Sequence, residues 1–217
     1  MTSWTEISSL ATGAGTLVLA VATFASVRSA NRAARIAEQA LMVNLRPLLV
    51  PSRLDDTKQK IYFQEGRFML LEGGRGGADF ENGVVYLGIS LRNAGPGIAV
   101  LHGWRFLAGA EINPPRPDLE TFRHQGRDIL IAPGDIGFWQ GAFRDSGDPQ
   151  YDEAVATVKN DDDEVVLSID LLYGDNDGGQ RVISRMMLRG YKRDQAADRQ
   201  WLASVVRHWN VDRPDPR

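Results

Sequence analysis

The sequence contains no cysteine, and this absence excludes several kinds of site. A disulfide framework, a thiolate metal site and a cysteine nucleophile all need that side chain. The chain also lacks a large net charge, because 25 basic and 28 acidic residues leave a formal net charge of -3 at pH 7. Since binding to a nucleic-acid duplex needs a basic field, we expect no nucleic-acid partner. The length of 217 residues suits one domain with an appendage.

Common catalytic and cofactor motifs are absent too. Neither the phosphate-binding pattern G-x-x-x-x-G-K-[ST] nor the esterase pattern G-x-S-x-G occurs. The spacing of His102, His124 and His208 does not predict a shared metal. The turn GDNDG fails the EF-hand template, because Tyr173 and Ser184 stand where acidic ligands are required. We therefore expect no enzymatic activity, no cofactor and no metal.

A long uncharged run lies near the N-terminus. No charged residue occurs from Ile7 to Val27, and a helix of that length is about 30 Å long, enough to cross the hydrocarbon core of a bilayer. The alternative is a cleaved signal peptide, since Ala20 and Ala22 form an A-x-A pattern. Residues 1–6 contain no Lys or Arg, which argues against a signal peptide. We expect a short tail over residues 1–6 and a transmembrane helix over residues 7–27.

The flanking charges predict the orientation of this span. Arg28, Arg32 and Arg35 follow it, whereas only Glu6 precedes it. By the positive-inside rule, we expect the N-terminus outside and the rest of the chain in the cytoplasm. Apolar residues then recur at spacings of three and four, so the helix is expected to continue as a stalk over residues 28–45. Pro47 marks its end.

Small residues form a stripe along this helix, and such stripes permit close approach of another helix. The predicted contact residues are Ala11, Gly15, Ala22, Ser26, Ala30, Ala34, Ala37 and Leu41. Besides the lipid bilayer, we expect another membrane protein or a second copy of the chain as partner. The alternative of equal weight is that an alanine-rich helix shows these spacings by chance.

After Pro51 the apolar pattern changes to strand-like alternation, interrupted by frequent turn residues. We expect a mainly β, antiparallel β-sandwich over residues 46–217, with an open barrel as the second choice. Glu72 to Gly77 is expected to be a flexible loop, and Asp148 to Lys159 a short helix with Pro149 in its first turn. The predicted strands are 46–51, 59–64, 67–71, 84–92, 98–107, 128–131, 136–143, 165–173, 180–189 and 201–209.

Most large aromatic residues of the β-domain are expected to pack in its core or at its rim. One polar and aromatic set, from several predicted strands, could instead bind a carboxylate, a phosphate or a peptide. Its members are Arg105, Arg185, Arg207, His208 and Trp209. The alternative, favoured by the alternation of strand faces, is that these side chains simply lie on solvated strand faces.

Several segments together resemble a family of uncharacterised bacterial membrane-anchored proteins of actinobacterial type. They are the uncharged span, LRPLLVPSR, LRNAGPGIA, LHGWRF, LLYGD and WLASVVRHWN. The resemblance implies a single-pass anchor at the plasma membrane of a bacterium and a β-domain, but no reaction, cofactor or site. We therefore expect a membrane-anchored interaction or assembly module, such as an accessory subunit of a membrane complex. The alternative is a sensor that binds a small anionic ligand or a peptide on the cytoplasmic β-domain.

Overall fold

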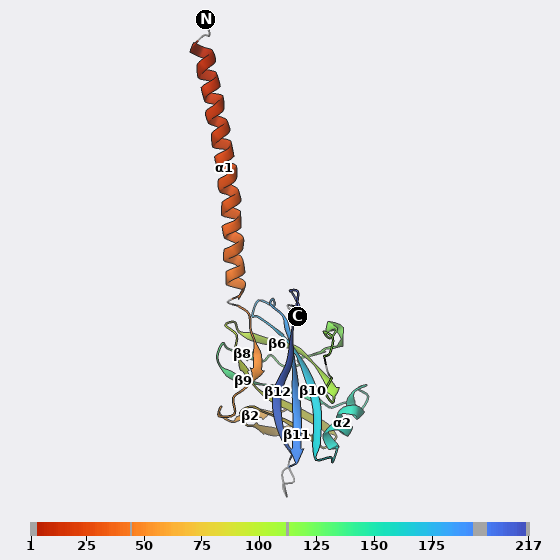
Figure 1. Cartoon of the computed structure of the whole chain (residues 1–217). Helices are drawn as coiled ribbons and strands as arrows, with labels where there is room; N and C mark the ends of the chain where they lie inside the picture. The colour runs from red at the N-terminus through yellow and green to blue at the C-terminus, as the bar shows by residue number, and fades with distance from the viewer. Residues whose placement is uncertain (1–3, 44, 112, 193–198, 216–217) are drawn as a thin grey trace. The chain divides into compact units, whose positions relative to one another are not determined.

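The structure is a computed structural model, which describes residues 4–43, 45–111, 113–192 and 199–215 (Figure 1). The chain divides into two compact units, Met1–Asn44 and Leu45–Arg217. Each unit is described here by itself.

The first unit contains one uninterrupted helix, α1 (Trp4–Val43). Its 40 residues correspond to a length of about 60 Å. The prediction that a long N-terminal apolar helix continues beyond Val27 is therefore confirmed, and the helix ends before Pro47 as expected. Among the described residues, α1 is the one helix long and apolar enough to span a membrane, with the candidate segment Ala11–Glu38.

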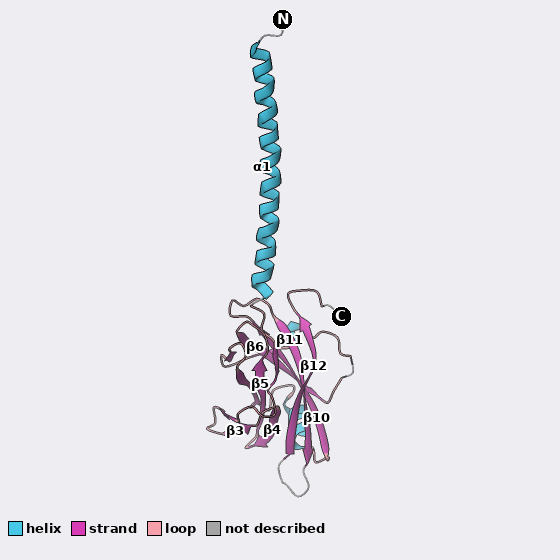
Figure 2. Ribbon diagram, turned by 60° about the vertical axis from the view of Figure 1, so that its left-hand side comes forward, coloured by secondary structure: helices cyan, strands magenta, loops and turns pink. Residues whose placement is uncertain are grey.

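The second unit is an antiparallel β-sandwich, as predicted. One layer contains β9 (Ile136–Phe143), β5 (Val84–Asn93), β4 (Arg75–Glu81) and β1 (Leu49–Pro51). The other contains β12 (Arg199–Asn210), β11 (Val182–Lys192), β10 (Glu164–Gly174), β6 (Ala99–Ala108), β7 (Arg123–His124) and β8 (Leu130–Ile131). Figure 2 shows β4 and β5 on one side and β10, β11 and β12 on the other.

A narrow connection joins the two layers. β12 pairs with β4 at Trp201–Gly76 and Leu202–Arg75, so the sheet folds over at this corner. On the opposite side, the described residues form no backbone ladder between β7 and β9. The sandwich therefore stays open along the free edge of β9.

The main core lies between the layers. Alternate residues of β5 and β10, among them Leu87, Ile89 and Ile169, are fully buried there. Aromatic rings join β6 to β9, since Trp104 packs edge-on against Trp139 with ring centroids 5.3 Å apart. Such packing of large rings supplies much of the hydrophobic stability of a domain of this size.

Two further elements cover parts of the sandwich. The hairpin of β2 (Gln59–Tyr62) and β3 (Phe68–Leu71) encloses a second buried cluster, with Ile61, Leu71 and Tyr86. The short helix α2 (Tyr151–Lys159) contacts β4, β5, β6 and β10, and buries Ala154. Pro149 does not lie in the first turn as predicted, because it precedes the N-cap residue Gln150. A short 3-10 helix, η1 (Leu119–Thr121), lies before β7.

The prediction of a loop at Glu72 to Gly77 is wrong for its second half, because Glu72 to Gly74 form a turn but β4 begins at Arg75. The alternation of apolar and polar residues that marks a strand is missing here. Glycines stand in place of apolar residues, because neighbouring layers lie close to the backbone of this strand. A Cβ on Gly76 would lie 2.5 Å from Leu188 Cδ2, and one on Gly77 would lie 2.2 Å from Met69 Sδ. These glycines let the opposite layer and the β2–β3 hairpin pack directly on the strand.

The connection from β5 to β6 is held by one buried asparagine. Asn93 Oδ1 accepts hydrogen bonds from the backbone N–H groups of Leu48 and Gly95, at 3.1 and 3.0 Å. Its Nδ2 donates to the carbonyls of Gly97 and Ile131, at 2.6 and 3.0 Å. One side chain thus joins three segments, which fixes the tight turn between β5 and β6.

Candidate binding sites on the β-domain

Four of the five residues of the predicted ligand surface meet on the outer face of the second layer. Arg105 on β6, Arg185 on β11 and Arg207 on β12 come into line because they occupy matching register positions. Trp209 lies beside them, with its ring centroid 5.4 Å from the guanidinium of Arg185 and 5.5 Å from that of Arg207. Cation–π contacts of this kind favour such stacking.

His208 does not join this group. Successive residues of a strand point to opposite faces, so the side chain between Arg207 and Trp209 must turn inward. Its Nδ1 lies 2.6 Å from Ser184 Oγ, which in turn lies 2.7 Å from the hydroxyl of Tyr173. Ser184 is fully buried, so this Ser–His pair is out of reach of a substrate.

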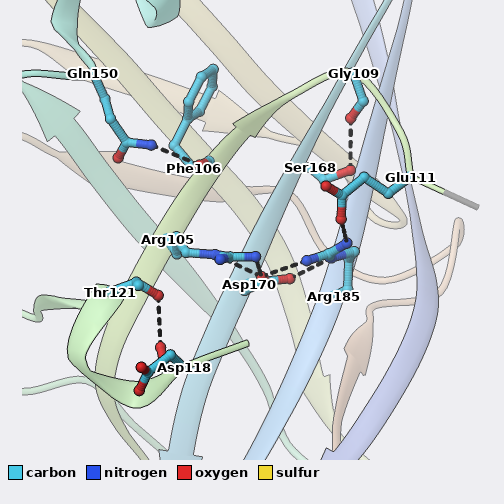
Figure 3. A network of polar contacts seen from close by, with 10 residues as sticks. All are labelled: Arg105, Phe106, Gly109, Glu111, Asp118, Thr121, Gln150, Ser168, Asp170 and Arg185. Carbon is cyan, nitrogen blue, oxygen red and sulfur yellow. Dashed lines mark hydrogen bonds and ion pairs between the residues drawn. The ribbon is translucent and has the colours of Figure 1, made fainter. Parts of the chain in front are cut away.

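Asp170, a residue that the sequence reasoning missed, lies at the centre of the arginine group. Figure 3 shows it on β10 between Arg105 and Arg185. Arg185 donates to it through Nε and Nη2, at 2.7 and 2.9 Å. Arg105 donates from the other side, with its Nη2 at 2.9 Å from Oδ2. Asp170 could have been noticed as the single charge within the apolar run VVLSIDLLY.

The hydrogen-bonded network around Asp170 is balanced in charge, whereas Arg207 beside it forms no ion pair with the described residues. A second carboxylate, that of Glu111, lies 2.7 Å from Nη1 of Arg185, so two carboxylates match Arg105 and Arg185. Burial alone would lower the pKa of Arg185, but hydrogen bonds and charge from Asp170 and Glu111 outweigh it and raise that pKa. A cavity of about 440 Å³ opens next to Arg105, and Glu111 and Glu153 line it. Arg105 and Arg185 are therefore better suited to stabilise the sheet than to bind an anion.

A second candidate site lies at the open side of the sandwich. A groove of about 500 Å³ runs between the segment 123–127, the strand β9 and the tip of the β2–β3 hairpin. Its volume falls within the usual range for ligand sites. The lining contains Arg123, Arg127 and Arg144 but no carboxylate, and it includes the aromatic side chains of Tyr62 and Trp104.

Two of the groove arginines are held at its ends. Arg123 binds the carboxylate of Asp148 with both terminal nitrogens, and its guanidinium lies over the rings of Trp104 and Phe143. The hydrogen bond from Arg123 lowers the pKa of Asp148. At the other end, Arg144 pairs with Glu65 and lowers its pKa through the same kind of hydrogen bond.

Arg127 differs from these two. It is exposed, and the described residues offer it neither an ion pair nor a hydrogen bond. An arginine fork without a partner in a groove without acids can bind a carboxylate or another anion. The sequence reasoning missed this site, although the basic segment RHQGR at 123–127 is a visible signal for it.

The described residues include no group of three or more His, Cys, Asp or Glu side chains that could hold a metal ion. Comparison with known proteins adds no assignment, because no protein-family model matches the chain and no curated protein is significantly similar to it. The resemblance to membrane-anchored actinobacterial proteins stays a prediction.

Proposed function

We propose that the chain is a single-pass, membrane-anchored interaction or assembly module, such as an accessory subunit of a membrane complex. The carrying observation is the exposure of α1. All side chains from Ala11 to Glu38 are exposed, including Leu17, Val18 and Phe24 at 67–69%. A long apolar surface of this kind needs lipid or another protein to cover it.

The faces of α1 support contact with a second helix. With 3.6 residues per turn, the eight predicted contact residues from Ala11 to Leu41 fall within a sector of about 140°. Leu17, Val21, Phe24 and Arg28 lie on the opposite side. Gly15 has no heavy atom within 4 Å of the position of a Cβ, so a neighbouring backbone can approach it closely.

The orientation in this proposal rests on Arg28, Arg32 and Arg35, which all lie C-terminal to the apolar part of α1. By the positive-inside rule, they favour a cytoplasmic location for the β-domain. Accessibility of an engineered cysteine to a membrane-impermeant reagent tests this point directly, because the chain has no cysteine of its own. A cysteine at exposed Asn176 should be labelled only after the membrane is permeabilised.

The test of the proposed function is cross-linking and co-purification from native membranes in mild detergent. Wild-type protein should yield a stoichiometric partner or a defined oligomer, and a variant lacking Met1 to Val27 should lose it. Ala22→Phe should weaken the association because a bulky side chain separates the helices, whereas Val21→Phe makes the same change on the opposite face. A chain that remains a monomer without a partner in native membranes refutes the proposal.

A second function has support from the groove. Its basic, carboxylate-free lining fits recognition of a small anionic ligand or a peptide by the β-domain. The candidate site for such a ligand is therefore the groove that contains Arg127, and not the arginine network around Asp170.

A further inference from the structure

The strand β9 has one unpaired edge, and a side-chain contact shows which backbone groups point to it. β9 pairs only with β5 among the described strands. Gln125 Nε2 donates to the carbonyl of Gln140 at 3.2 Å, from the side away from β5. The N–H and C=O of a strand residue point to the same side, and the side alternates along the strand. The backbone groups of Phe138, Gln140 and Ala142 therefore point to the open edge.

Side chains close this edge incompletely. Gln125 spans the gap, because its Oε1 also accepts a hydrogen bond from Trp139 Nε1 at 3.1 Å. Among the described residues no other hydrogen bond reaches the outward-facing backbone groups of β9. Gln140 to Ala142 line the groove directly, which gives about 10 Å of accessible strand edge. Edges of this kind accept an added strand unless something covers them.

We infer that the groove binds an extended peptide segment of a partner protein, which adds to β9 as a further antiparallel or parallel strand and places an acidic side chain on Arg127. This inference rests on the proposed interaction function and names the surface and the partner chemistry. Backbone hydrogen bonds to the N–H of Gln140 and to both backbone groups of Ala142 supply the affinity, as in other strand-addition complexes, while the Gln140 carbonyl stays bound to Gln125. The carboxylate supplies specificity, because Arg127 has no partner within the described chain.

Two other occupants fit less well. A second copy paired edge to edge through β9 would offer no acidic partner to Arg127 and would place a second uncompensated Arg127 at the same interface, and like charges across an interface oppose association. A compact anion could bind Arg127 but would leave the outward backbone groups of β9 without partners. An exposed aromatic side chain, Tyr62 at 55%, also lines the groove and suits contact with a peptide side chain.

The test uses the full chain in lipid nanodiscs and a display library of random linear peptides. The selected peptides should share an acidic residue within a β-prone sequence. Ala142→Pro removes the outward N–H without touching the ladder to β5, so it should weaken binding at least about tenfold. Ala142→Ser keeps that N–H and should bind like the wild type.

A second pair of variants tests the charge. Arg127→Glu should weaken binding of the selected peptides about tenfold, and Arg53→Glu serves as the control at an exposed arginine outside the groove. Thermal unfolding shows whether each variant is folded. Hydrogen exchange supplies an independent signature, because a bound strand should slow exchange of the Gln140 and Ala142 amides, whereas a compact anion such as inorganic phosphate should not.

Several outcomes would overturn the inference. They are a library without enriched peptides, enriched peptides without an acidic residue, equal binding by the proline and serine variants, and unchanged exchange along β9. Native co-purification separates this inference from the proposed function. A partner that binds folded Ala142→Pro and Arg127→Glu as well as wild type leaves the interaction function standing but places it on another surface.

Discussion

Replacement of Asp170 by asparagine tests whether the buried arginine network stabilises the sheet. Asp170 is fully buried, and Arg185 is 1% exposed, so the mutation removes the main counter-charge of a guanidinium that water cannot reach. Breaking one partner of a buried ion pair costs about 3–5 kcal/mol. Because asparagine keeps one acceptor oxygen, we expect the lower end, about 3 kcal/mol. For a chain of this size that loss corresponds to roughly 6–12 °C in the midpoint of thermal unfolding.

Tryptophan fluorescence of the full chain in mild detergent is a suitable assay, because the β-domain contains the buried indoles Trp104, Trp139, Trp201 and Trp209. The control is Glu111→Gln, which also removes a carboxylate from Arg185 but at a side chain that is 55% exposed. Its cost should stay below about 1 kcal/mol, since water screens the pair. The reasoning is refuted if Asp170→Asn lowers the midpoint no more than Glu111→Gln does.

A double variant tests whether the loss of stability comes from leaving one buried charge without its partner. Asp170→Leu combined with Arg185→Met removes both buried charges, while Arg105, at 21% exposed, can turn its guanidinium toward solvent. Replacing a buried ion pair with apolar side chains is often neutral or stabilising. The double variant should therefore unfold at a higher temperature than Asp170→Asn.

Three further predictions concern other buried polar groups. Burial lowers the pKa of His102, and the charge of Arg181 lowers it further, despite the opposing effect of Asp175. As the pH falls, the unfolded chain therefore binds a proton at His102 before the folded chain does. The free energy of unfolding should fall as the pH drops below about 6.5. Denaturant midpoints at pH 7.5 and 5.5 should differ less for His102→Gln, and an equal difference would contradict this assignment. Asn93→Ala should cost about 3 kcal/mol or more in urea unfolding, because three buried backbone groups and one half-buried one lose their partner. A loss below about 1 kcal/mol would show that water replaces the side chain. Burial raises the pKa of Tyr173 to about 12, so this phenol should stay protonated at pH 11 in a spectrophotometric titration, in which Tyr173→Phe should leave the absorbance change unaltered.

The sequence by itself determined the elements whose pattern is local. The lack of charge from Ile7 to Val27 and the position of Pro47 were enough to predict α1, because a helix is fixed by residues three and four apart. Alternation and glycine-containing turns likewise predicted the long strands from β5 to β12. The period of two also places Arg207 and Trp209 on one face and His208 on the other, although the predicted surface combined them.

Only the tertiary structure decided which segments meet. The strand β4 carries glycines because Leu188 and Met69 pack closely against its two faces. No local sequence pattern indicates such long-range contacts. Asp170 acquires its role from Arg105 and Arg185, which come from two other strands and reach it through the register of the sheet. The groove depends on the open edge of β9 and on Gln125, which is brought to it from the opposite layer. Contacts of this kind depend on long-range packing, so the candidate binding surface emerged from the fold rather than from any motif.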